Sequence, residues 1–367
     1  MLSNPLALIA EITHRCPLHC VYCSNPLELA AANSELRTED WRRVFADAAQ
    51  MGVLHLHLTG GEPLARTDLE ELVSAARTNK LYTNLITSGL GLSRDRLNKL
   101  VDAGLDHIQL SFQDGRQDRA DWIAGTKSHA HKIELANWIR EHRIAFTANL
   151  VVHRQNLDHL EDTLQFLESL RPARIEIAHT QYYGWALKNR AALMPTAAQV
   201  EKALEVTAAF EQRVKGRIRV DSVVPDYYAQ YPKACMGGWG RRIMLIDPAG
   251  RAMPCHAAGV IPGLEFENVR DHSLGEIWTG SAAFNKFRGE DWMQEPCRTC
   301  QRRTEDFGGC RCQALLLAGD PAATDPVCSL APRHDIVVNT LAQTPAQVLA
   351  PATLAEIWTY RPNPSRT

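Results

Sequence analysis

Three cysteines in one short segment have the types and the spacing to bind a metal. Cys16, Cys20 and Cys23 lie in the stretch EITHRCPLHCVYC, with three residues between the first pair and two between the second. This spacing allows three thiolates to face one corner of a cubane iron–sulfur cluster, which takes four cysteines when fully ligated. One iron then stays open for an outside ligand. Pro17 stiffens the start of the loop, and Tyr22 offers an aromatic face near the open iron.

Two other interpretations of these cysteines stay open on spacing alone. They could form a zinc site completed by His14 or His19, or they could be ordinary buried thiols. Three thiols in one turn seldom occur without a metal. The pattern therefore predicts a metal centre and leaves the metal undecided.

Alternating strand-like and helix-like segments must position this loop. Strands are expected at residues 6–12, 53–58, 82–87, 107–112, 145–152 and 174–178. Helices are expected after N-caps at Thr38 and Asn156, after capping boxes of Thr67 with Glu70 and of Thr196 with Gln199, from Ser93, and around residues 129–143. About six strand–helix units predict an α/β fold, a partial (β/α)6 barrel of the TIM type.

Chemistry in such barrels lies at the carboxyl ends of the strands. The cysteine loop follows the first strand, and Gly60, Gly61 and Glu62 follow the second. Paired glycines allow the backbone to approach a ligand, and Glu62 offers acceptors to a cationic amine, although a simple turn explains the same residues. The other polar candidates at strand ends, which capping or core packing also explains, are Ser88, Ser111, Gln113, Asn149, His179 and Tyr182. We expect this whole set to rim one mouth.

The other cysteines lie beyond about residue 223, where the strand–helix alternation stops. They are Cys235, Cys255, Cys297, Cys300, Cys310, Cys312 and Cys328. The sequence around them is rich in Gly and Pro and has few long apolar runs, so we expect a bound metal to contribute to its folding. A zinc ribbon is an alternative here, because Cys297 and Cys300 have the spacing of a zinc knuckle.

Composition excludes several classes of protein. The 367 residues carry 40 Lys+Arg against 42 Asp+Glu, so no basic field favours nucleic acid. The apolar opening lacks the basic region and cleavage site of a signal peptide, and no apolar run approaches the roughly 20 residues of a membrane span. We expect a cytoplasmic protein, away from membranes, whose cysteines bind metal instead of forming disulfides.

The CxxxCxxC loop, with an aromatic residue before its last cysteine, resembles the signature of the radical S-adenosylmethionine (SAM) superfamily. This resemblance implies a [4Fe–4S] cluster on Cys16, Cys20 and Cys23 whose open iron binds SAM. Reductive cleavage of SAM in that family gives a 5'-deoxyadenosyl radical that takes a hydrogen atom from substrate. The GGEP stretch that contains Glu62 resembles the family's motif for the SAM amino group. By position only, the resemblance implies SAM contacts from Tyr22, Ser88, Ser111, Gln113 and Asn149.

The cysteine-rich region resembles the SPASM extension of radical SAM enzymes, which houses auxiliary iron–sulfur clusters. The implied ligands are Cys235, Cys255, Cys310 and Cys312 for a first auxiliary cluster, and Cys297, Cys300, Asp306 and Cys328 for a second. The family pattern has a cysteine where this chain has Asp306, so a carboxylate, a harder ligand than thiolate, would replace it. A solvated loop acid is the alternative for Asp306.

Similarity over nearly the full length, including Asp306 with Cys312 and the stretches QLSFQD and HTQYYGWA, looks like the family that cyclises the peptide PqqA in pyrroloquinoline quinone (PQQ) biosynthesis. It implies a carbon–carbon cross-link between Glu and Tyr side chains of PqqA, with His179 or Tyr182 accepting the ring proton. The implied partners are the PqqA peptide, the peptide chaperone PqqD and an electron donor such as flavodoxin. The alternatives are a sulfatase-maturing or thioether-forming SPASM enzyme, or a non-catalytic iron–sulfur or zinc-binding protein.

The same resemblance divides the chain. We expect the radical SAM barrel at residues 1–222, the SPASM domain at 223–335 and a tail at 336–367. A short helix is expected in the tail near residues 352–359, and the tail offers no recognisable chemistry.

Overall fold

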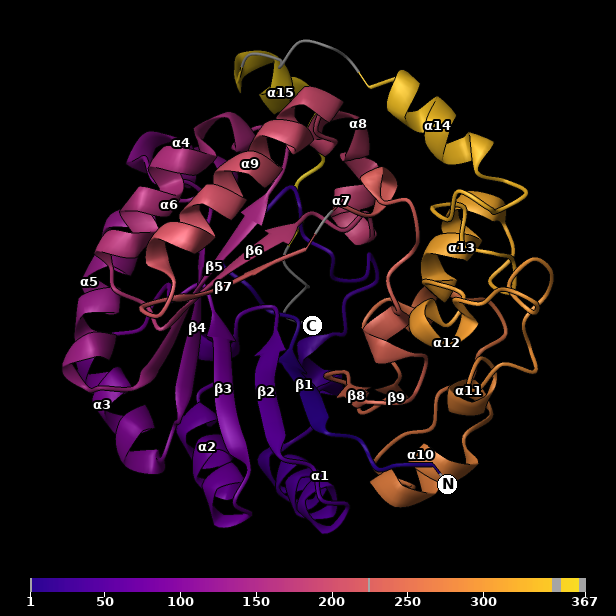
Figure 1. Ribbon diagram of the computed structural model, residues 1–367. Helices are drawn as coiled ribbons and strands as arrows, with labels where there is room; N and C mark the ends of the chain where they lie inside the picture. The colour runs from indigo at the N-terminus through magenta and orange to yellow at the C-terminus, as the bar shows by residue number, and fades with distance from the viewer. Residues whose placement is uncertain (1, 224, 345–350, 363–367) are drawn as a thin grey trace.

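A curved sheet forms the centre of the molecule (Figure 1). The computed structural model describes residues 2–223, 225–344 and 351–362. Within them the sheet has nine strands in the order β7-β6-β5-β4-β3-β2-β1-β8-β9. The sheet does not close, so the predicted partial barrel is confirmed.

The six predicted strands are present and parallel. They are β1 (Ala7–Thr13), β2 (His55–Gly60), β3 (Tyr82–Thr87), β4 (His107–Phe112), β5 (Ala145–Val152) and β6 (Arg174–His179). β2 begins later than predicted, because the Val53 amide donates to the Ala48 carbonyl and closes the end of the preceding helix.

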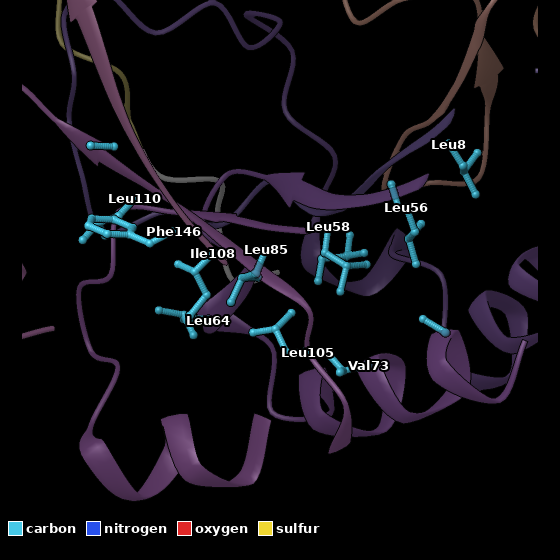
Figure 2. Packing of buried hydrophobic residues seen from close by; sticks show 14 of the residues in the cluster. Leu8, Leu56, Leu58, Leu64, Val73, Leu85, Leu105, Ile108, Leu110 and Phe146 are labelled. Carbon is cyan, nitrogen blue, oxygen red and sulfur yellow. The ribbon is translucent and has the colours of Figure 1, made fainter. Parts of the chain in front are cut away.

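Helices cover the outer side of the sheet (Figure 1). They are α1 (Thr38–Gln50), α2 (Leu69–Thr78), α3 (Arg94–Ala103), α5 (His129–Glu141), α6 (Leu160–Ser169) and α9 (Ala197–Val214). α4 (Gln117–Ala124) follows the carboxyl end of β4, and α7 (Gly184–Lys188) and α8 (Arg190–Leu193) follow that of β6. Figure 2 shows the packing between the helices and the sheet. Leu58, Leu85 and Ile108 from the strands belong to the same buried cluster as Val73 from α2. Each such fully buried aliphatic side chain contributes about 1.5–3 kcal/mol.

Two predicted helix caps near the start of the chain are wrong. Thr38 is the first residue of α1 and not its cap, and its hydroxyl instead donates to Asp68 Oδ2 at 2.6 Å. The capping box of Thr67 with Glu70 is absent, because α2 starts at Leu69 with Asp68 as its N-cap.

Of the other predicted caps, those at Ser93 and Thr196 are confirmed and the one at Asn156 is wrong. Ser93 caps α3 by accepting from the Arg96 amide, and Thr196 forms the capping box of α9 with Gln199. Asn156 precedes a short 3₁₀ turn and not α6 itself. Its side-chain oxygen accepts from the His153 amide at 2.8 Å, so it does not cap a helix.

The sheet extends beyond the predicted strands. β7 (Arg219–Ser222) is parallel to β6, β8 (Ile243–Ile246) is parallel to β1, and β9 (Ala252–Met253) is antiparallel to β8. The cysteine-rich part of the chain therefore adds strands beside β1, the strand that leads into the cysteine loop. The predicted domain boundaries stay predictions.

Short helices make up most of the remaining regular structure. They are α10 (Leu274–Gly280), α11 (Ala282–Asn285), α12 (Arg303–Asp306), α13 (Arg311–Ala318), α14 (Asp335–Ala342) and α15 (Pro351–Ile357). The 3₁₀ turns are Ala32–Ser34, Pro63–Ala65, Leu157–His159, Asp226–Tyr228, Cys235–Gly237 and Ala258–Val260. α15 confirms the predicted tail helix. No helix in the described ranges is long and apolar enough to span a bilayer.

Candidate active site and metal centres

The cysteine loop opens onto a cavity of about 340 Å³ at the carboxyl ends of the strands. Cys16, Cys20 and Cys23 all line this cavity, as the sequence led us to expect. Burial raises the pKa of Cys16 to about 12 and that of Cys23 to about 11, while the positive charge of Arg361 opposes the shift in both. A metal that binds these sulfurs as thiolates must therefore displace their protons.

Gly60 and Gly61 hold the GGEP segment against the backbone that precedes Cys16. The Gly61 amide donates to the Thr13 carbonyl at 2.6 Å, and the next amide donates to the Arg15 carbonyl at 2.7 Å. A Cβ at Gly60 would lie 2.3 Å from the Thr13 oxygen, and one at Gly61 would lie 2.4 Å from the Arg15 oxygen. The close approach expected of these glycines is thus made to the cysteine loop itself, and both also line the cavity.

Glu62 lies next to the cavity, and both oxygens of its carboxylate accept hydrogen bonds from the protein. Oε1 accepts from Thr87 Oγ1 at 2.5 Å and from the Leu64 amide at 3.1 Å. Oε2 accepts from the Ser88 amide at 2.8 Å and from Ser88 Oγ at 2.5 Å. Burial raises the pKa of Glu62, while these hydrogen bonds lower it. Glu62 therefore orients Thr87 and Ser88, which line the cavity, and is not itself one of the lining residues.

Tyr22 belongs to a buried polar chain that sequence reasoning missed in part. Gln113 Nε2 donates to the Tyr22 hydroxyl at 3.0 Å, and Gln113 Oε1 accepts from Lys132 Nζ at 2.7 Å. Lys132 also donates to the Ser111 carbonyl at 2.8 Å. Burial raises the pKa of Cys20, and the Lys132 charge is the first effect that opposes it. The spacing of Lys132 on α5 gave no signal of this role.

The remaining predicted residues separate into two groups. Ser111 and His179 line the cavity, as do Tyr22 and Ser88. Asn149 points its amide to Glu176 Oε2 at 3.1 Å and is not a lining residue. Tyr182 packs against Tyr227, with 5.4 Å between ring centroids, and is likewise outside the lining set.

His179 and Tyr182 differ as proton acceptors. Burial, with the Lys233 charge, lowers the pKa of His179 to about 4, so its imidazole is neutral at pH 7. Burial raises the pKa of Tyr182, so this hydroxyl keeps its own proton. Of the two predicted acceptors, only His179 both lines the cavity and has a neutral imidazole that can accept a proton.

Four cysteines of the C-terminal region form a closed ring of sulfur contacts. Cys235 is in hydrogen-bonding contact with Cys255 and Cys310, and Cys312 is in contact with the same two. These contacts raise the pKa of Cys235 and Cys312 and lower that of Cys255 and Cys310. The four residues come from a 3₁₀ turn, the segment after β9 and the start of α13. These four residues could hold a four-cysteine iron–sulfur cluster.

Tyr183 joins the four-cysteine ring to the barrel mouth. Its hydroxyl lies 2.9 Å from Cys310 Sγ. A second cavity, of about 230 Å³, is lined by Tyr183, Gln181 and three of the ring cysteines, and Gln181 also lines the first cavity. The stretch from His179 to Tyr183 was expected at the mouth, with Tyr182 as the candidate acceptor, because the sequence does not show in which direction either of two adjacent tyrosine side chains points.

A third cysteine group surrounds a small cavity of about 20 Å³. Its lining includes Cys297, Cys300, Cys328 and Asp306. Asp306 is only 7% exposed, so it is not a solvated loop acid. Burial raises the pKa of Asp306, and the Gly308 amide donates to its Oδ1 at 3.0 Å. The chemistry of this set fits a second cluster with one oxygen ligand.

The donor sets suit clusters better than single ions. In the described ranges, no three His, Cys, Asp or Glu side chains are arranged to hold one metal ion between them. A cubane cluster has no such need, because each thiolate binds a different iron.

The tail, in which the sequence showed no recognisable chemistry, reaches the cysteine loop. Arg361 is buried beside the cysteine loop and its Nη2 donates to the His14 carbonyl. Its charge lowers the pKa of all three loop cysteines against the larger effect of burial. No pattern in the sequence links a residue this far along the chain to Cys16.

This fold and its cysteine sets define a radical SAM enzyme with a SPASM extension. The model of the Radical SAM superfamily matches residues 10–167, and that of the SPASM iron-sulfur cluster-binding domain matches residues 235–301. Structures of Streptococcus suis SuiB bound to S-adenosylmethionine (TM-score 0.75, 20% identity, 90% of this chain and 78% of that one) and of anSMEcpe with bound AdoMet (TM-score 0.64, 15% identity, 92% and 96%) share the fold. The two family models give SAM and iron–sulfur clusters as its cofactors.

Curated relatives narrow the family further. The PqqA peptide cyclase of Methylobacterium nodulans is 55% identical over 91% of this chain and 88% of its own length. That of Methylocella silvestris is 54% identical over 91% of this chain and 90% of its own length. The chain belongs to the PqqA peptide cyclase family.

Proposed function

We propose that the protein joins a Glu and a Tyr side chain of the PqqA precursor peptide by a carbon–carbon bond in PQQ biosynthesis. The observation that carries this proposal is the pair of cavities that share Gln181, one lined by the cysteine loop and the other by Cys235, Cys255 and Cys310. Family membership supplies the peptide, because the relatives bear the name PqqA peptide cyclase.

Within this proposal the first cavity binds the cofactors. Cys16, Cys20 and Cys23 hold the [4Fe–4S] cluster. When bound, the cluster and SAM supply a 5'-deoxyadenosyl radical that removes a hydrogen atom from the peptide. The cavity's polar lining, including Ser88 and Ser111, and the backbone of Gly60 and Gly61 face SAM. Glu62 and Gln113 act one step away, through Ser88 and Tyr22. Asn149 is placed farther out by its bond to Glu176.

The second cavity serves the oxidation that completes the cross-link. Joining two C–H positions removes two hydrogen atoms from the peptide, and one of them leaves with the radical. The other leaves as a proton and an electron. Neutral His179 is the proton acceptor in this scheme. The ring of Cys235, Cys255, Cys310 and Cys312 would hold an auxiliary cluster beside Tyr183, and that cluster would supply the acceptor for the electron. Cys297, Cys300, Asp306 and Cys328 would hold a second auxiliary cluster, and that cluster would supply an outward path for the electron.

The proposal extends to partners that the family suggests. PqqD would present the peptide, and a reductant such as flavodoxin would deliver the starting electron. Metal-binding use of the ten cysteines suits a reducing, cytoplasmic setting.

The test is incubation of anaerobically prepared, reduced protein with SAM, PqqA and PqqD. We expect 5'-deoxyadenosine and a peptide lighter by two hydrogens, with fragmentation that assigns the new bond to Glu and Tyr. The variant Cys23→Ala is the control and should yield neither product. Formation of 5'-deoxyadenosine with an unchanged PqqA mass would reject the substrate. A link through sulfur in place of carbon would favour the thioether-forming class.

A further inference from the structure

Arg361 contacts the cysteine loop on both sides of Cys16. Its Nη2 donates to the His14 carbonyl, and its own carbonyl oxygen lies 2.7 Å from His19 Nδ1. Because a carbonyl only accepts, His19 must carry its proton on Nδ1. The side chain of Arg361 is 1% exposed and lies over the Trp185 ring, 5.9 Å from its centroid. A residue of the tail thus fixes the loop that starts the site.

Two nitrogens of this guanidinium are left without partners. Nε and Nη1 are both buried and have no hydrogen-bond partner among the described residues. A buried donor that is left unsatisfied costs roughly 1–3 kcal/mol, and more when it is charged. Arg361 lies against the loop that carries Cys16, Cys20 and Cys23, with its contacts to His14 and His19 on either side of Cys16. A group with negatively charged sulfurs on these cysteines would supply the missing acceptors.

Contacts that do not involve Arg361 hold the tail in this position. Asn189 Nδ2 donates to the Val21 carbonyl and to the Thr359 carbonyl, each at 2.8 Å, and Asn189 Oδ1 accepts from the Thr359 amide at 2.8 Å. The Trp358 ring stacks on Trp122, with 4.6 Å between centroids. Arg361 can therefore be changed without removing what anchors the tail.

We propose that Arg361 is a positioning residue that donates hydrogen bonds from Nε and Nη1 to the sulfurs of the first cluster. This inference rests on the proposed cluster at Cys16, Cys20 and Cys23. Reduction adds a negative charge to the cluster, and a fixed positive charge with hydrogen bonds to sulfur stabilises that state. Arg361 therefore raises the reduction potential of the first cluster and slows its loss.

The experiment compares Arg361→Gln, Arg361→Lys and a control, Arg217→Gln, in full-length protein reconstituted with iron and sulfide. Arg217 is also an arginine, but its side chain is 60% exposed on the outside of the barrel. Two quantities are measured without turnover: the midpoint potential of the electron paramagnetic resonance (EPR) signal that changes when SAM is added, and the rate at which a chelator removes iron. The thermal unfolding midpoint of each variant reports folding.

We expect Arg361→Gln to shift the potential to a more negative value and to lose iron several-fold faster. Arg361→Lys keeps the charge but loses the two-nitrogen geometry, so it should fall between Arg361→Gln and the native protein. Arg217→Gln should match the native protein in both measurements. An unchanged potential and an unchanged rate of iron loss in Arg361→Gln would overturn the proposal, whether or not the protein is less stable.

A separate variant distinguishes failure of this inference from failure of the proposed function. Replacing Cys16, Cys20 and Cys23 together with Ala should abolish the SAM-responsive signal. If that signal persists, the cluster does not reside on these cysteines and the proposed function fails with it. If the signal disappears but Arg361→Gln behaves as the native protein, only the role of Arg361 is wrong.

Discussion

The hydroxyl oxygen of Tyr183 lies 2.9 Å from the sulfur of Cys310. Burial raises the pKa of Tyr183, so its hydroxyl keeps its proton at neutral pH and is the donor in this pair. The Cys310 amide in turn donates to Asp325 Oδ2 at 2.9 Å. A single side chain from the loop after β6 thus connects the barrel mouth to the four-cysteine ring.

This connection predicts that Tyr183→Phe slows cross-linking while leaving SAM cleavage in place. A hydrogen bond to a charged sulfur contributes about 1.5–3 kcal/mol, so the rate of peptide cross-linking should fall about tenfold or more. The measurement is the ratio of cross-linked peptide to 5'-deoxyadenosine. Tyr182→Phe is the matched control, because Tyr182 is adjacent but outside the cavity lining, and equal losses in both variants would contradict the role of Tyr183.

Cys310→Ala removes one sulfur of the ring instead of its hydrogen-bond donor. We expect SAM cleavage to stay measurable and cross-linked peptide to disappear, because the second electron loses its exit. Mass spectrometry of the peptide together with assay of 5'-deoxyadenosine checks both parts. Retention of cross-linking in this variant would count against the exit.

The fold was largely predictable because strand periodicity and the cysteine loop are local signals. β1 to β6 follow apolar runs of the expected length, and the cavity gathers the residues at their ends. β8 escaped prediction, since four apolar residues between Gly-rich segments resemble any buried turn until β1 is available to pair with them.

The site was predictable in position and less so in role. Glu62 was expected to face a ligand amine, which stays a prediction, and its carboxylate accepts three hydrogen bonds from Thr87 and Ser88 and a fourth from the Leu64 amide. Lys132 and Arg361 act on the cysteine loop from α5 and from the tail, and such contacts depend on tertiary packing that no spacing encodes.

Gly61→Ala tests the fit between the GGEP segment and the cysteine loop. The new Cβ would lie 2.4 Å from the Arg15 oxygen, which is backbone and has little room to move. Overpacking of this kind costs about 1–3 kcal/mol, so we expect lower thermal stability and weaker SAM binding. Gly275→Ala is the control, because nothing lies within 4 Å of its Cβ position. Native SAM affinity in Gly61→Ala, measured by calorimetry, would show that the segment shifts freely.

His153 gives the protein a built-in loss of stability in acid. Burial, with the Arg119 charge, lowers its pKa from 6.5 to about 3. The unfolded chain therefore binds one proton more than the folded chain between these values, and stability falls as the pH drops from 6.5 toward 3. His153→Gln should take up about one proton fewer on unfolding over this pH range, so its unfolding free energy should depend less steeply on pH. Identical pH dependence in the variant and the native protein would assign the acid sensitivity to other groups.

Asp306 offers the sharpest test of the second auxiliary site. Asp306→Asn keeps the shape but removes the anionic oxygen, so we expect loss of the iron held by this cluster and of its EPR signal. Asp306→Cys restores the thiolate of the family pattern and should keep the iron with a changed reduction potential. Glu305→Gln is the matched control, because Glu305 is the neighbouring carboxylate but is exposed. If Asp306→Asn and Glu305→Gln both keep native iron content and native signals, Asp306 is a structural residue, and the fourth ligand must be sought elsewhere around Cys297, Cys300 and Cys328.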